Sequence, residues 1–489
     1  MEVHSYPKGC AFKNLQDIQD KKITIMGLGL NGGGEASVRF FLKHGAIVTV
    51  TDMKTAEQLQ TTLDSLSPEI NQYGNKLRFV LGKHELSDFE NADLVIKNPG
   101  VKYTGNKFLA AAKNIETDLS IFLNFTKAPI IAITGSKGKS STVSAIYYGL
   151  KEAGFNAFLG GNITVSPLTF LDQTNETTPV VLELSSWQLA DLRGRGVLNP
   201  KISLITTIVP DHQNWYGGME PYVADKKIIY STQNENDWTI CCANDKWGDI
   251  FASETQGKVL KYGQEDSIPE YCGVWLSPNG QGYIRLPDMK EPALILDKLL
   301  VPGKHMKINA LNAALVMTLM NVTVEKTKAI LQTWPGIHHR LEYFHSWQTK
   351  QNTIKFYNDS AATVPEAAAA ALNAFTEENN FIHLISGGTD KELDFEVFEK
   401  ALKNNPPASL YLLSGTGTDK LLPLLNKSNV KYNGPFNSLE ELLLSVKEKL
   451  ENQTQDAVVI FSPGATSFGM FKNEFDRGNT YKALVKNIF

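Results

Sequence analysis

The chain has 489 residues, of which 42% are hydrophobic and 20% are charged, and its formal net charge is −4. This length predicts about three domains, and the small negative charge argues against a broad nucleic-acid-binding surface. No run approaches the roughly 20 apolar residues of a membrane span, and residues 1–16 lack the apolar core of a signal peptide, so we expect a cytoplasmic protein without nucleic acid or membrane as a partner.

The first predicted elements are a strand from residue 22, a glycine-rich turn, a helix over 35–45 and a second strand over 46–52. The turn matches the G-x-G-x-x-G fingerprint, and Asp52 ends the second strand. Alone, this pattern indicates an NAD enzyme. Backbone N–H groups do not read a base, however, so the diphosphate of a UDP-sugar fits equally well. The candidate binding residues are Gly27, Leu28, Gly29, Asn31, Gly32 and Asp52.

A second glycine loop follows the apolar strand predicted over 128–134 and precedes a helix. Glycines let backbone N–H groups approach phosphate oxygens, and the helix N-terminus favours anions. Only two residues separate the two glycines, which is shorter than the full Walker spacing, and a plain strand-to-helix turn is the alternative. The candidate phosphate-binding residues are Gly135, Ser136, Lys137, Gly138, Lys139, Ser140 and Ser141.

Two metal-ligand candidates follow the next strands of this block. Glu183 lies at the end of the strand predicted from 179, and His212 follows the strand predicted over 200–209. Open parallel sheets place ligands at the carboxyl ends of their strands, and a bound triphosphate needs a divalent cation with oxygen or nitrogen ligands. A solvated carboxylate and a surface histidine are the alternatives.

The remaining chain continues the alternation of strands and helices. Residues 238–301 are rich in short strands and turns, and strands near 353, 381, 409 and 456 are separated by helical segments. This pattern predicts an α/β fold with three domains, each a mostly parallel sheet flanked by helices. We expect a Rossmann-like domain over 1–117, a P-loop ATPase-type domain over 118–336 and a second Rossmann-like domain over 337–489.

Ten short motifs, taken in order, resemble the Mur ligase family, closest to its D-glutamate-adding members. They span nearly the whole chain: GLGLNG, TGSKGKSS, GGNI, ELSSWQL, PDHQNWY, GKHMKINALNAA, GIHHRLE, NDSAAT, SPGATSF and NEFDRG. The resemblance implies an ATP-dependent ligase of peptidoglycan synthesis. Its substrates would be ATP, glutamate and UDP-N-acetylmuramoyl-L-alanine, whose carboxylate becomes an acyl phosphate before the amine attacks.

The same resemblance implies the roles of individual residues. Lys139, Lys226, His212 and Glu183 would be catalytic. Two Mg²⁺ ions would be held by Ser140, Glu183, His212 and a carbamate formed from CO₂ on Lys226, and carbamate formation requires a lowered lysine pKa. Further ATP contacts would come from Asn309, Arg340 and Asp359. Asn162 and Ser185 would contact the muramoyl substrate, and Ala361, Ser467 and Phe468 would lie at the amino-acid site.

Some positions depart from the family pattern. Ala361 stands where D-glutamate ligases carry the lysine that pairs with the glutamate side chain, and Met306 replaces an asparagine near adenine. An unpaired carboxylate is costly to bury. L-glutamate or another amino acid therefore remains an alternative substrate, with Lys472 as one possible cation.

Other functions also remain open at this level. A folylpolyglutamate synthase-like ligase would lack the first 117 residues, and an NAD oxidoreductase would leave the second glycine loop unexplained. A non-catalytic relative of the ligases is disfavoured because the four catalytic candidates are retained. The four cysteines lack metal-ligand spacing and are expected to be reduced. We expect a monomer.

Overall fold

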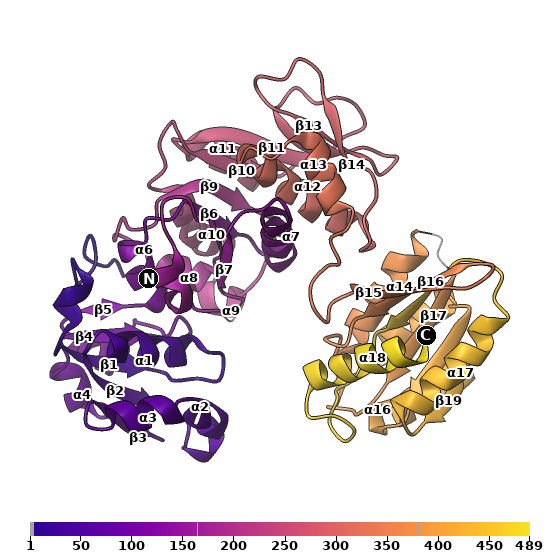
Figure 1. Ribbon diagram of the computed structural model, residues 1–489, viewed down its shortest axis with the longest axis horizontal. Coiled ribbons are helices and arrows are strands. Elements are labelled where there is room, and N and C mark those ends of the chain that lie inside the picture. Colours follow the sequence, from indigo (N-terminus) through magenta and orange to yellow (C-terminus); the bar gives the residue numbers. More distant parts are fainter. Residues whose placement is uncertain (1–3, 164, 379–380) are drawn as a thin grey trace. The chain divides into compact units, whose positions relative to one another are not determined.

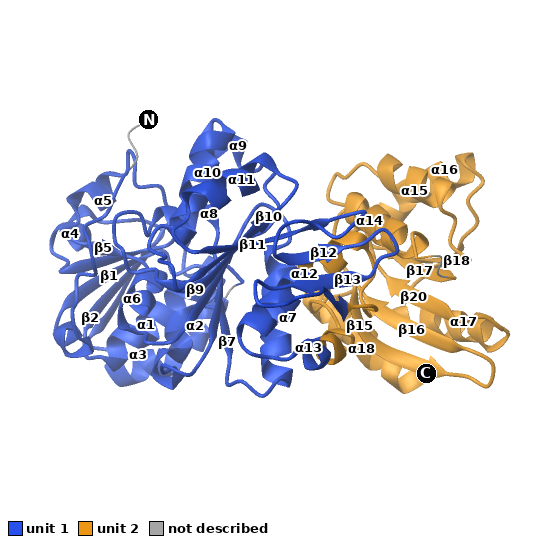
Figure 2. Ribbon diagram, turned by 90° about the horizontal axis from the view of Figure 1, so that it is seen from above, with its two compact units in different colours: residues 1–295, 311–327 blue, residues 296–310, 328–489 orange. Residues whose placement is uncertain are grey.

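The computed structural model describes residues 4–163, 165–378 and 381–489 (Figure 1). It contains three sheets flanked by helices, which confirms the predicted α/β class. The chain forms two compact units (Figure 2): unit 1 holds residues 1–295 and 311–327, and unit 2 holds residues 296–310 and 328–489. Each of the three predicted segments contains one sheet, while their boundaries stay predictions.

The first sheet of unit 1 has the strand order β3-β2-β1-β4-β5, with parallel neighbours throughout. The glycine-rich turn follows β1, so it lies at the carboxyl edge of the sheet, where ligands bind in such folds. The strands are β1 Lys22–Met26, β2 Ile47–Asp52, β3 Leu77–Leu81, β4 Leu94–Lys97 and β5 Ile115–Glu116. The helices are α1 Gly33–Lys43, α2 Gln60–Ser65, α3 Ser67–Tyr73, α4 Leu86–Glu90, α5 Lys107–Ala111 and α6 Asp118–Phe125.

The second sheet has the order β14-β13-β12-β11-β10-β9-β6-β8-β7, and its strands are parallel from β7 to β12. β13 runs antiparallel to β12. The strands are β6 Ile130–Thr134, β7 Phe158–Gly161, β8 Val180–Glu183, β9 Pro200–Ile205, β10 Trp238–Cys242, β11 Lys258–Gln264, β12 Gly273–Leu276, β13 Gly282–Arg285 and β14 Ala293–Leu296.

The helices of this region are α7 Lys139–Glu152, α8 Ser186–Ala190, α9 Gln213–Tyr216, α10 Met219–Lys227, α11 Lys246–Glu254, α12 Lys304–Leu319 and α13 Val324–Leu331. The sequence predicted short strands and turns over 238–301, and α11 is an addition to that prediction. The Asp245 side chain caps α11 by accepting a hydrogen bond from the N–H of Trp247 at 3.1 Å.

One continuous apolar core joins the first two sheets of unit 1. Ile25 and Val48 of the first sheet belong to the same buried cluster as Ile130 and Leu182 of the second. Shared burial of this kind removes apolar surface of both sheets from water together. Most of the first two predicted segments therefore lies in one compact unit, while residues 296–310 and 328–336 belong to unit 2.

Unit 2 holds the third sheet, with the order β15-β16-β20-β17-β18-β19. β15 is antiparallel to β16, and the other neighbours are parallel. Its strands are β15 Glu342–Gln348, β16 Thr353–Asn358, β17 Ile382–Gly387, β18 Ser409–Leu413, β19 Asn433–Phe436 and β20 Ala457–Phe461. One buried cluster includes residues of α14 Pro365–Thr376, α15 Glu396–Asn404 and α16 Thr416–Lys427. A second buried cluster includes residues of α17 Leu439–Glu451 and α18 Glu474–Ile488.

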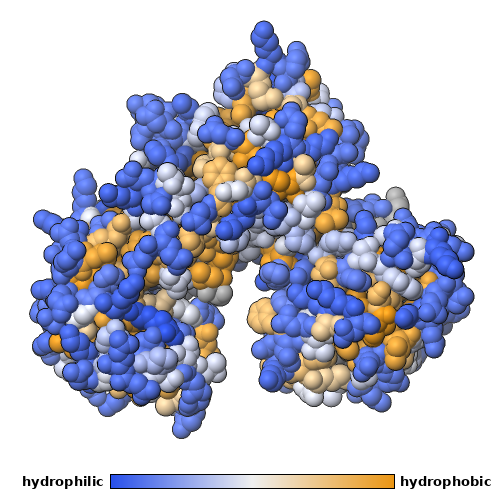
Figure 3. Space-filling view, viewed as in Figure 1, coloured by the Kyte–Doolittle hydropathy of each residue, from blue (hydrophilic) through white to orange (hydrophobic). Residues whose placement is uncertain are grey.

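Hydrophilic residues cover much of the face shown in Figure 3, with apolar residues in patches between them. Within residues 4–163, 165–378 and 381–489, no helix combines the length and the apolarity that crossing a membrane requires. All four cysteines are free thiols.

Candidate active site

The phosphate loop joins β6 to α7 in a conformation that requires glycine. Gly135 has a φ of +141°, and a Cβ there would lie 1.9 Å from Oγ1 of Thr206. Gly138, with a φ of +93°, directly precedes α7. The N–H groups of the first turn of α7 therefore have no acceptor within the helix and point toward its N-terminal end, which suits an anion.

Ser136 ties this loop to the segment that leads to His212. The backbone N–H groups of Ser136 and Lys137 donate to the carbonyl oxygen of Thr207 at 2.9 and 3.3 Å. The Ser136 hydroxyl donates to the carbonyl oxygen of Val209 at 2.8 Å and accepts from the Val209 N–H at 3.0 Å. Ser136, predicted to bind ATP, thus anchors the loop in this structure.

Two lysines meet at this loop. Nζ of Lys139 donates to the carbonyl oxygens of Gly135 and Ser136 at 2.9 and 3.1 Å. Nζ of Lys226, on α10, donates to the same Gly135 oxygen at 2.9 Å. Lys226 is only 1% exposed, and burial together with the charge of Lys139 lowers its pKa to about 7. An uncharged amine is therefore available at Lys226 near neutral pH.

Burial also lowers the pKa of the Lys139 side chain below its ordinary value. The charges of Glu183 and Asp211 act in the opposite direction and favour the ammonium form. Asp211 also forms an ion pair with the exposed Lys137 at 3.6 Å. Both carboxylates are thus close enough to the lysine pair to influence its protonation.

Glu183 ends β8 with one carboxylate oxygen left unpaired. Oε1 accepts a hydrogen bond from Nδ2 of Asn162 at 3.0 Å, and the Asn162 N–H donates to the Glu183 carbonyl oxygen at 2.8 Å. Oε2 is buried and has no hydrogen-bond partner among the described residues. Because a buried carboxylate oxygen without a donor is costly, this atom is suited to a bound cation.

His212 is exposed and follows β9 in a left-handed conformation, with a φ of +51°. Its N–H donates to Oδ1 of Asp211 at 3.0 Å. Its ring centroid lies 4.9 Å from that of Trp187. The contact between Ser136 and Val209 holds the start of this segment against the phosphate loop, so His212 lies at the same edge of the sheet as the lysines.

A cleft of about 310 Å³ in unit 1 joins the glycine-rich turn of the first sheet to the edge of the second sheet. Its lining includes four of the residues predicted to bind the UDP-linked substrate, namely Gly27, Asn31, Asn162 and Ser185. It also includes residues that sequence analysis did not select, among them Lys97, Asn98, Asp118, Ser166, Trp187 and Gln188. Asn162 both lines this cleft and holds Glu183.

The other four residues predicted for this substrate are not among those that line the cleft. The side chain of Leu28 is buried in the apolar core. The Asp52 carboxylate accepts backbone hydrogen bonds from Gly29 at 3.0 Å and from Lys54 at 2.9 Å. Gly32 directly precedes α1 with a φ of +81°. In this structure Asp52 stabilises the turn, since both of its oxygens accept backbone N–H groups.

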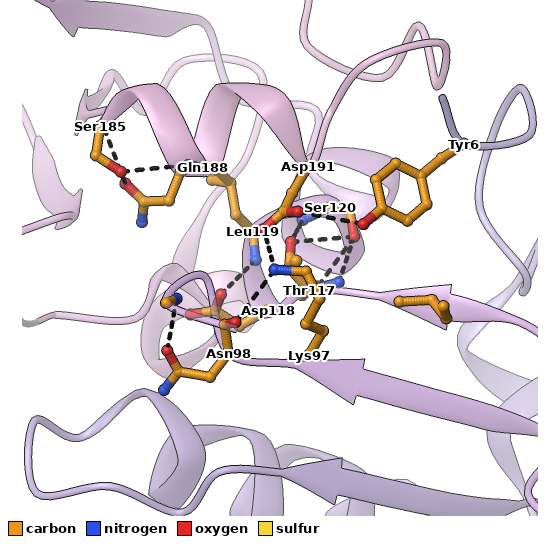
Figure 4. Close-up of polar contacts among 12 residues, drawn as sticks. Tyr6, Lys97, Asn98, Thr117, Asp118, Leu119, Ser120, Ser185, Gln188 and Asp191 are labelled. Atoms are coloured by element: carbon orange, nitrogen blue, oxygen red, sulfur yellow. Dashed lines mark hydrogen bonds and ion pairs between the residues drawn. The ribbon is translucent and has the colours of Figure 1, made fainter. Parts of the chain in front are cut away.

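A buried ion pair lies beside the cleft (Figure 4). Nζ of Lys97 lies 2.8 Å from Oδ2 of Asp191, and the Tyr6 hydroxyl donates to Oδ1 of Asp191 at 3.2 Å. A second buried pair joins Arg195 to Glu116 at 2.8 Å. These contacts link residues far apart in sequence, so no local motif signals them.

Asn309, Arg340 and Asp359, the remaining predicted ATP contacts, lie in unit 2. Asp359 is buried after β16, where it accepts hydrogen bonds from the Ser462 hydroxyl at 2.6 Å and the Leu341 N–H at 3.1 Å. Burial raises its pKa to about 7 despite these donors. Arg340 is exposed, and Asn309 is buried on α12.

The predicted amino-acid-binding residues also lie in unit 2. The Ala361 N–H donates to the His339 carbonyl oxygen at 3.0 Å, Ser467 is buried and Phe468 is exposed. The buried guanidinium of Arg477 donates to the carbonyl oxygens of Ser360 at 2.8 Å and Ala465 at 3.0 Å. Arg477 thus ties the two loops together. Arg477 belongs to the NEFDRG motif, but the motif alone does not predict this role.

Comparison with known families identifies both parts of unit 1. A model of the Mur ligase MurD-like N-terminal domain matches residues 21–118, and a model of the Mur ligase middle domain matches residues 133–317.

Two curated relatives match over nearly their whole length. A UDP-N-acetylmuramoylalanine–D-glutamate ligase from Treponema pallidum (strain Nichols) is 40% identical, and the match covers 96% of this chain and 98% of the relative. A protein of the same name from Borreliella burgdorferi (strain ATCC 35210 / DSM 4680 / CIP 102532 / B31) is 38% identical, with coverage of 97% and 99%.

Solved structures show the same fold at low identity. The UDP-N-acetylmuramate-alanine ligase MurC from Thermotoga maritima is 19% identical, with a TM-score of 0.54 and coverage of 96% of this chain and 99% of that one. MurF from Acinetobacter baumannii is 15% identical, with a TM-score of 0.54 and coverage of 82% and 92%.

Proposed function

The chain belongs to the Mur ligase family, and from that premise we propose that it joins D-glutamate to UDP-N-acetylmuramoyl-L-alanine in an ATP-dependent reaction of peptidoglycan synthesis. The observation that carries this proposal is the position of Asn162. Asn162 lines the cleft that begins at the glycine-rich turn, and its side-chain amide donates a hydrogen bond to Glu183 beside the phosphate loop. A sugar nucleotide in the cleft would therefore have its far end next to a bound triphosphate.

The residues present fit a divalent cation at this edge of the sheet. Oε2 of Glu183 is buried without a donor, and the Ser140 hydroxyl lies in the first turn of α7. Bound Mg²⁺ would neutralise the crowded phosphate oxygens. Among the described residues, no three histidine, cysteine, aspartate or glutamate side chains converge on one metal position. We propose that its further ligands are phosphate oxygens, water and hydroxyl or modified side-chain oxygens.

Lys226 is suited to supply such an oxygen as a carbamate. Its neutral amine would attack CO₂, forming an N–C bond and releasing one proton. With a pKa of about 7, about half of these side chains are neutral at pH 7. The carbamate would replace a positive charge next to Lys139 by a negative one, which relieves the repulsion between the two ammonium groups. We propose that this carbamate and His212 hold a second Mg²⁺ ion.

The remaining steps are those that membership of the Mur ligase family implies, placed on the residues of this loop. The substrate carboxylate attacks the γ-phosphorus of ATP, ADP leaves, and an acyl phosphate forms. Lys139 and the N–H groups of α7 stabilise the negative charge on the transferring phosphoryl group. The neutral amine of glutamate then attacks the acyl carbon and loses one proton to solvent, and phosphate leaves as the amide bond forms.

The amino acid is proposed to be D-glutamate because the full-length relatives bear that name. Ala361 offers no charge to the glutamate side chain, so L-glutamate is the alternative that an experiment has to separate. Lys472 has an exposed side chain directly before the N-cap of α18, and we retain it as the candidate cation.

The proposal also covers the setting of the reaction. We place it in the cytoplasm, in keeping with four free cysteines, and we propose that the chain works as a monomer. Incubation of the purified chain with ATP, Mg²⁺, UDP-N-acetylmuramoyl-L-alanine and D- or L-glutamate tests the function. A UDP product heavier by one glutamyl residue is expected with D-glutamate, and product with L-glutamate alone would refute the stereochemistry.

A further inference from the structure

Three aromatic rings form a cluster at the carboxyl edge of the second sheet, with the rings tilted against one another. The ring of Trp187, on α8, lies 4.9 Å from that of His212 and 4.8 Å from that of Trp215, on α9. Trp187 is also one of the residues that line the cleft. The aromatic cluster therefore connects a wall of the cleft to a predicted metal ligand.

The polar group of the Trp187 ring has no partner. Its Nε1 is buried, and no acceptor among the described residues lies within hydrogen-bond distance. A buried donor left unsatisfied costs free energy comparable to a lost hydrogen bond. Because Trp187 is one of the residues that line the cleft, a molecule bound there is a candidate for the missing acceptor.

A lysine from the other wall completes the arrangement. Asn98, Pro99 and Gly100 follow β4 and line the cleft from the first sheet. Two residues later, Nζ of Lys102 lies 3.7 Å from the ring centroid of Trp215, which is a close cation–π contact. Lys102 thereby joins the loop after β4 to the helix whose tryptophan contacts Trp187.

We propose that Trp187 is a binding residue for the UDP-linked substrate, donating its indole N–H to a substrate oxygen, and that Trp215 and Lys102 are positioning residues that hold its ring. This inference rests on the proposed function, because it takes the sugar nucleotide as the occupant of the cleft. It adds a donor, and a contact between the two walls, that the predicted binding residues do not include.

Trp187→Phe tests the donor with the least disturbance, because it keeps an aromatic ring and removes only the N–H group. Titration calorimetry with UDP-N-acetylmuramoyl-L-alanine, without ATP, measures binding alone. We expect the dissociation constant to rise about two- to tenfold, the range of one neutral hydrogen bond. In steady state the KM for this substrate should rise while kcat stays within about twofold, since the contact forms before the chemistry.

A double-mutant cycle tests the positioning residues. Lys102→Met and Trp215→Leu should each weaken substrate binding about two- to fivefold, the range of a cation–π contact at an exposed site. Lys102→Met should have little further effect in the Trp215→Leu background, because the two side chains act as one contact.

The chain offers a matched control in Lys258 and Trp238, whose cation–π distance is 5.2 Å. They are the first residues of β11 and β10, at the opposite edge of the sheet. Lys258→Met and Trp238→Leu should leave substrate binding unchanged.

The outcomes separate this inference from the proposed function. If the wild-type chain binds no UDP-N-acetylmuramoyl-L-alanine, the proposed function fails and the inference fails with it. If the wild-type chain binds and Trp187→Phe binds equally well, only the inference is overturned. Independent, additive effects of Lys102→Met and Trp215→Leu would overturn the positioning role.

Discussion

Lys139 and Lys226 donate hydrogen bonds to one acceptor, the carbonyl oxygen of Gly135, each at 2.9 Å. Two ammonium groups this close repel each other, and both are largely removed from water. Lys226 has the lower exposure and a pKa of about 7, so it is the residue that gives up its proton. Glu183 and Asp211 favour the ammonium form of Lys139, which suits a bound triphosphate.

Replacement of Lys226 by alanine should abolish ligase activity, with a loss of at least about a hundredfold, because a metal ligand is removed. Lys227 is the matched control, since it is adjacent and pairs with Glu254 at the surface. Lys227→Ala should retain activity in the same phosphate-release assay. Equal activity of both variants would contradict the role given to Lys226.

The carbamate itself is open to direct observation. Wild-type chain exchanged into buffer with ¹³CO₂ should show a carbamate signal in carbon NMR that is missing from Lys226→Ala. The signal should weaken as pH falls below about 7, because the amine becomes protonated. A signal unchanged in Lys226→Ala would assign the carbamate to another lysine.

Glu183→Gln should raise the Mg²⁺ concentration needed for half-maximal activity about 10- to 100-fold, since a neutral amide replaces the carboxylate whose Oε2 is unpaired. Mg²⁺ titration at saturating ATP measures this. An unchanged Mg²⁺ requirement would mean that Oε2 is not a ligand.

Lys97→Met should destabilise unit 1 by about 3–5 kcal/mol, because Asp191 would remain buried without its cation. Lys43→Met, which breaks the exposed pair with Asp172, should cost about 1 kcal/mol or less. Urea unfolding of the two variants compares these values, and equal losses would contradict a structural role for the buried pair.

Asp359 should make stability depend on pH. Its pKa is raised to about 7 in the folded chain, against about 3.9 when unfolded. Between these values the folded state holds a proton that the unfolded state has lost, so the stability contribution falls as pH rises from about 4 to 7. Asp359→Asn should remove this part of the slope. Parallel pH profiles of unfolding free energy for the two proteins would contradict it.

Much of the fold was predictable because its signals are local. Apolar strands followed by glycine turns and helices gave the order of elements from β1 to α1 and from β6 to α7. α11 was absent from the prediction, because residues 238–301 show strand and turn patterns on both sides of it. The continuous core of unit 1 was also hidden, since residues as far apart in sequence as Ile25 and Ile130 come into one buried cluster only in the folded chain.

For the site, residue types were easier to predict than contacts. The loop lysine and Glu183 stand at strand ends, where function was expected. Asp52 matched a binding pattern, yet its oxygens accept backbone N–H groups. Lys97 forms an ion pair with Asp191, which lies 94 residues away in the sequence, and no sequence motif predicts a partner at such a distance.

Oxygen-isotope transfer tests the central claim most directly. The chain is incubated with ATP, Mg²⁺, D-glutamate and UDP-N-acetylmuramoyl-L-alanine that carries ¹⁸O in its terminal carboxylate. The mass of the released phosphate is then measured by mass spectrometry. If that carboxylate attacks ATP at the loop where Lys139 and Lys226 meet, each phosphate carries one ¹⁸O atom. Phosphate released without label would contradict the acyl-phosphate route and the site built around it.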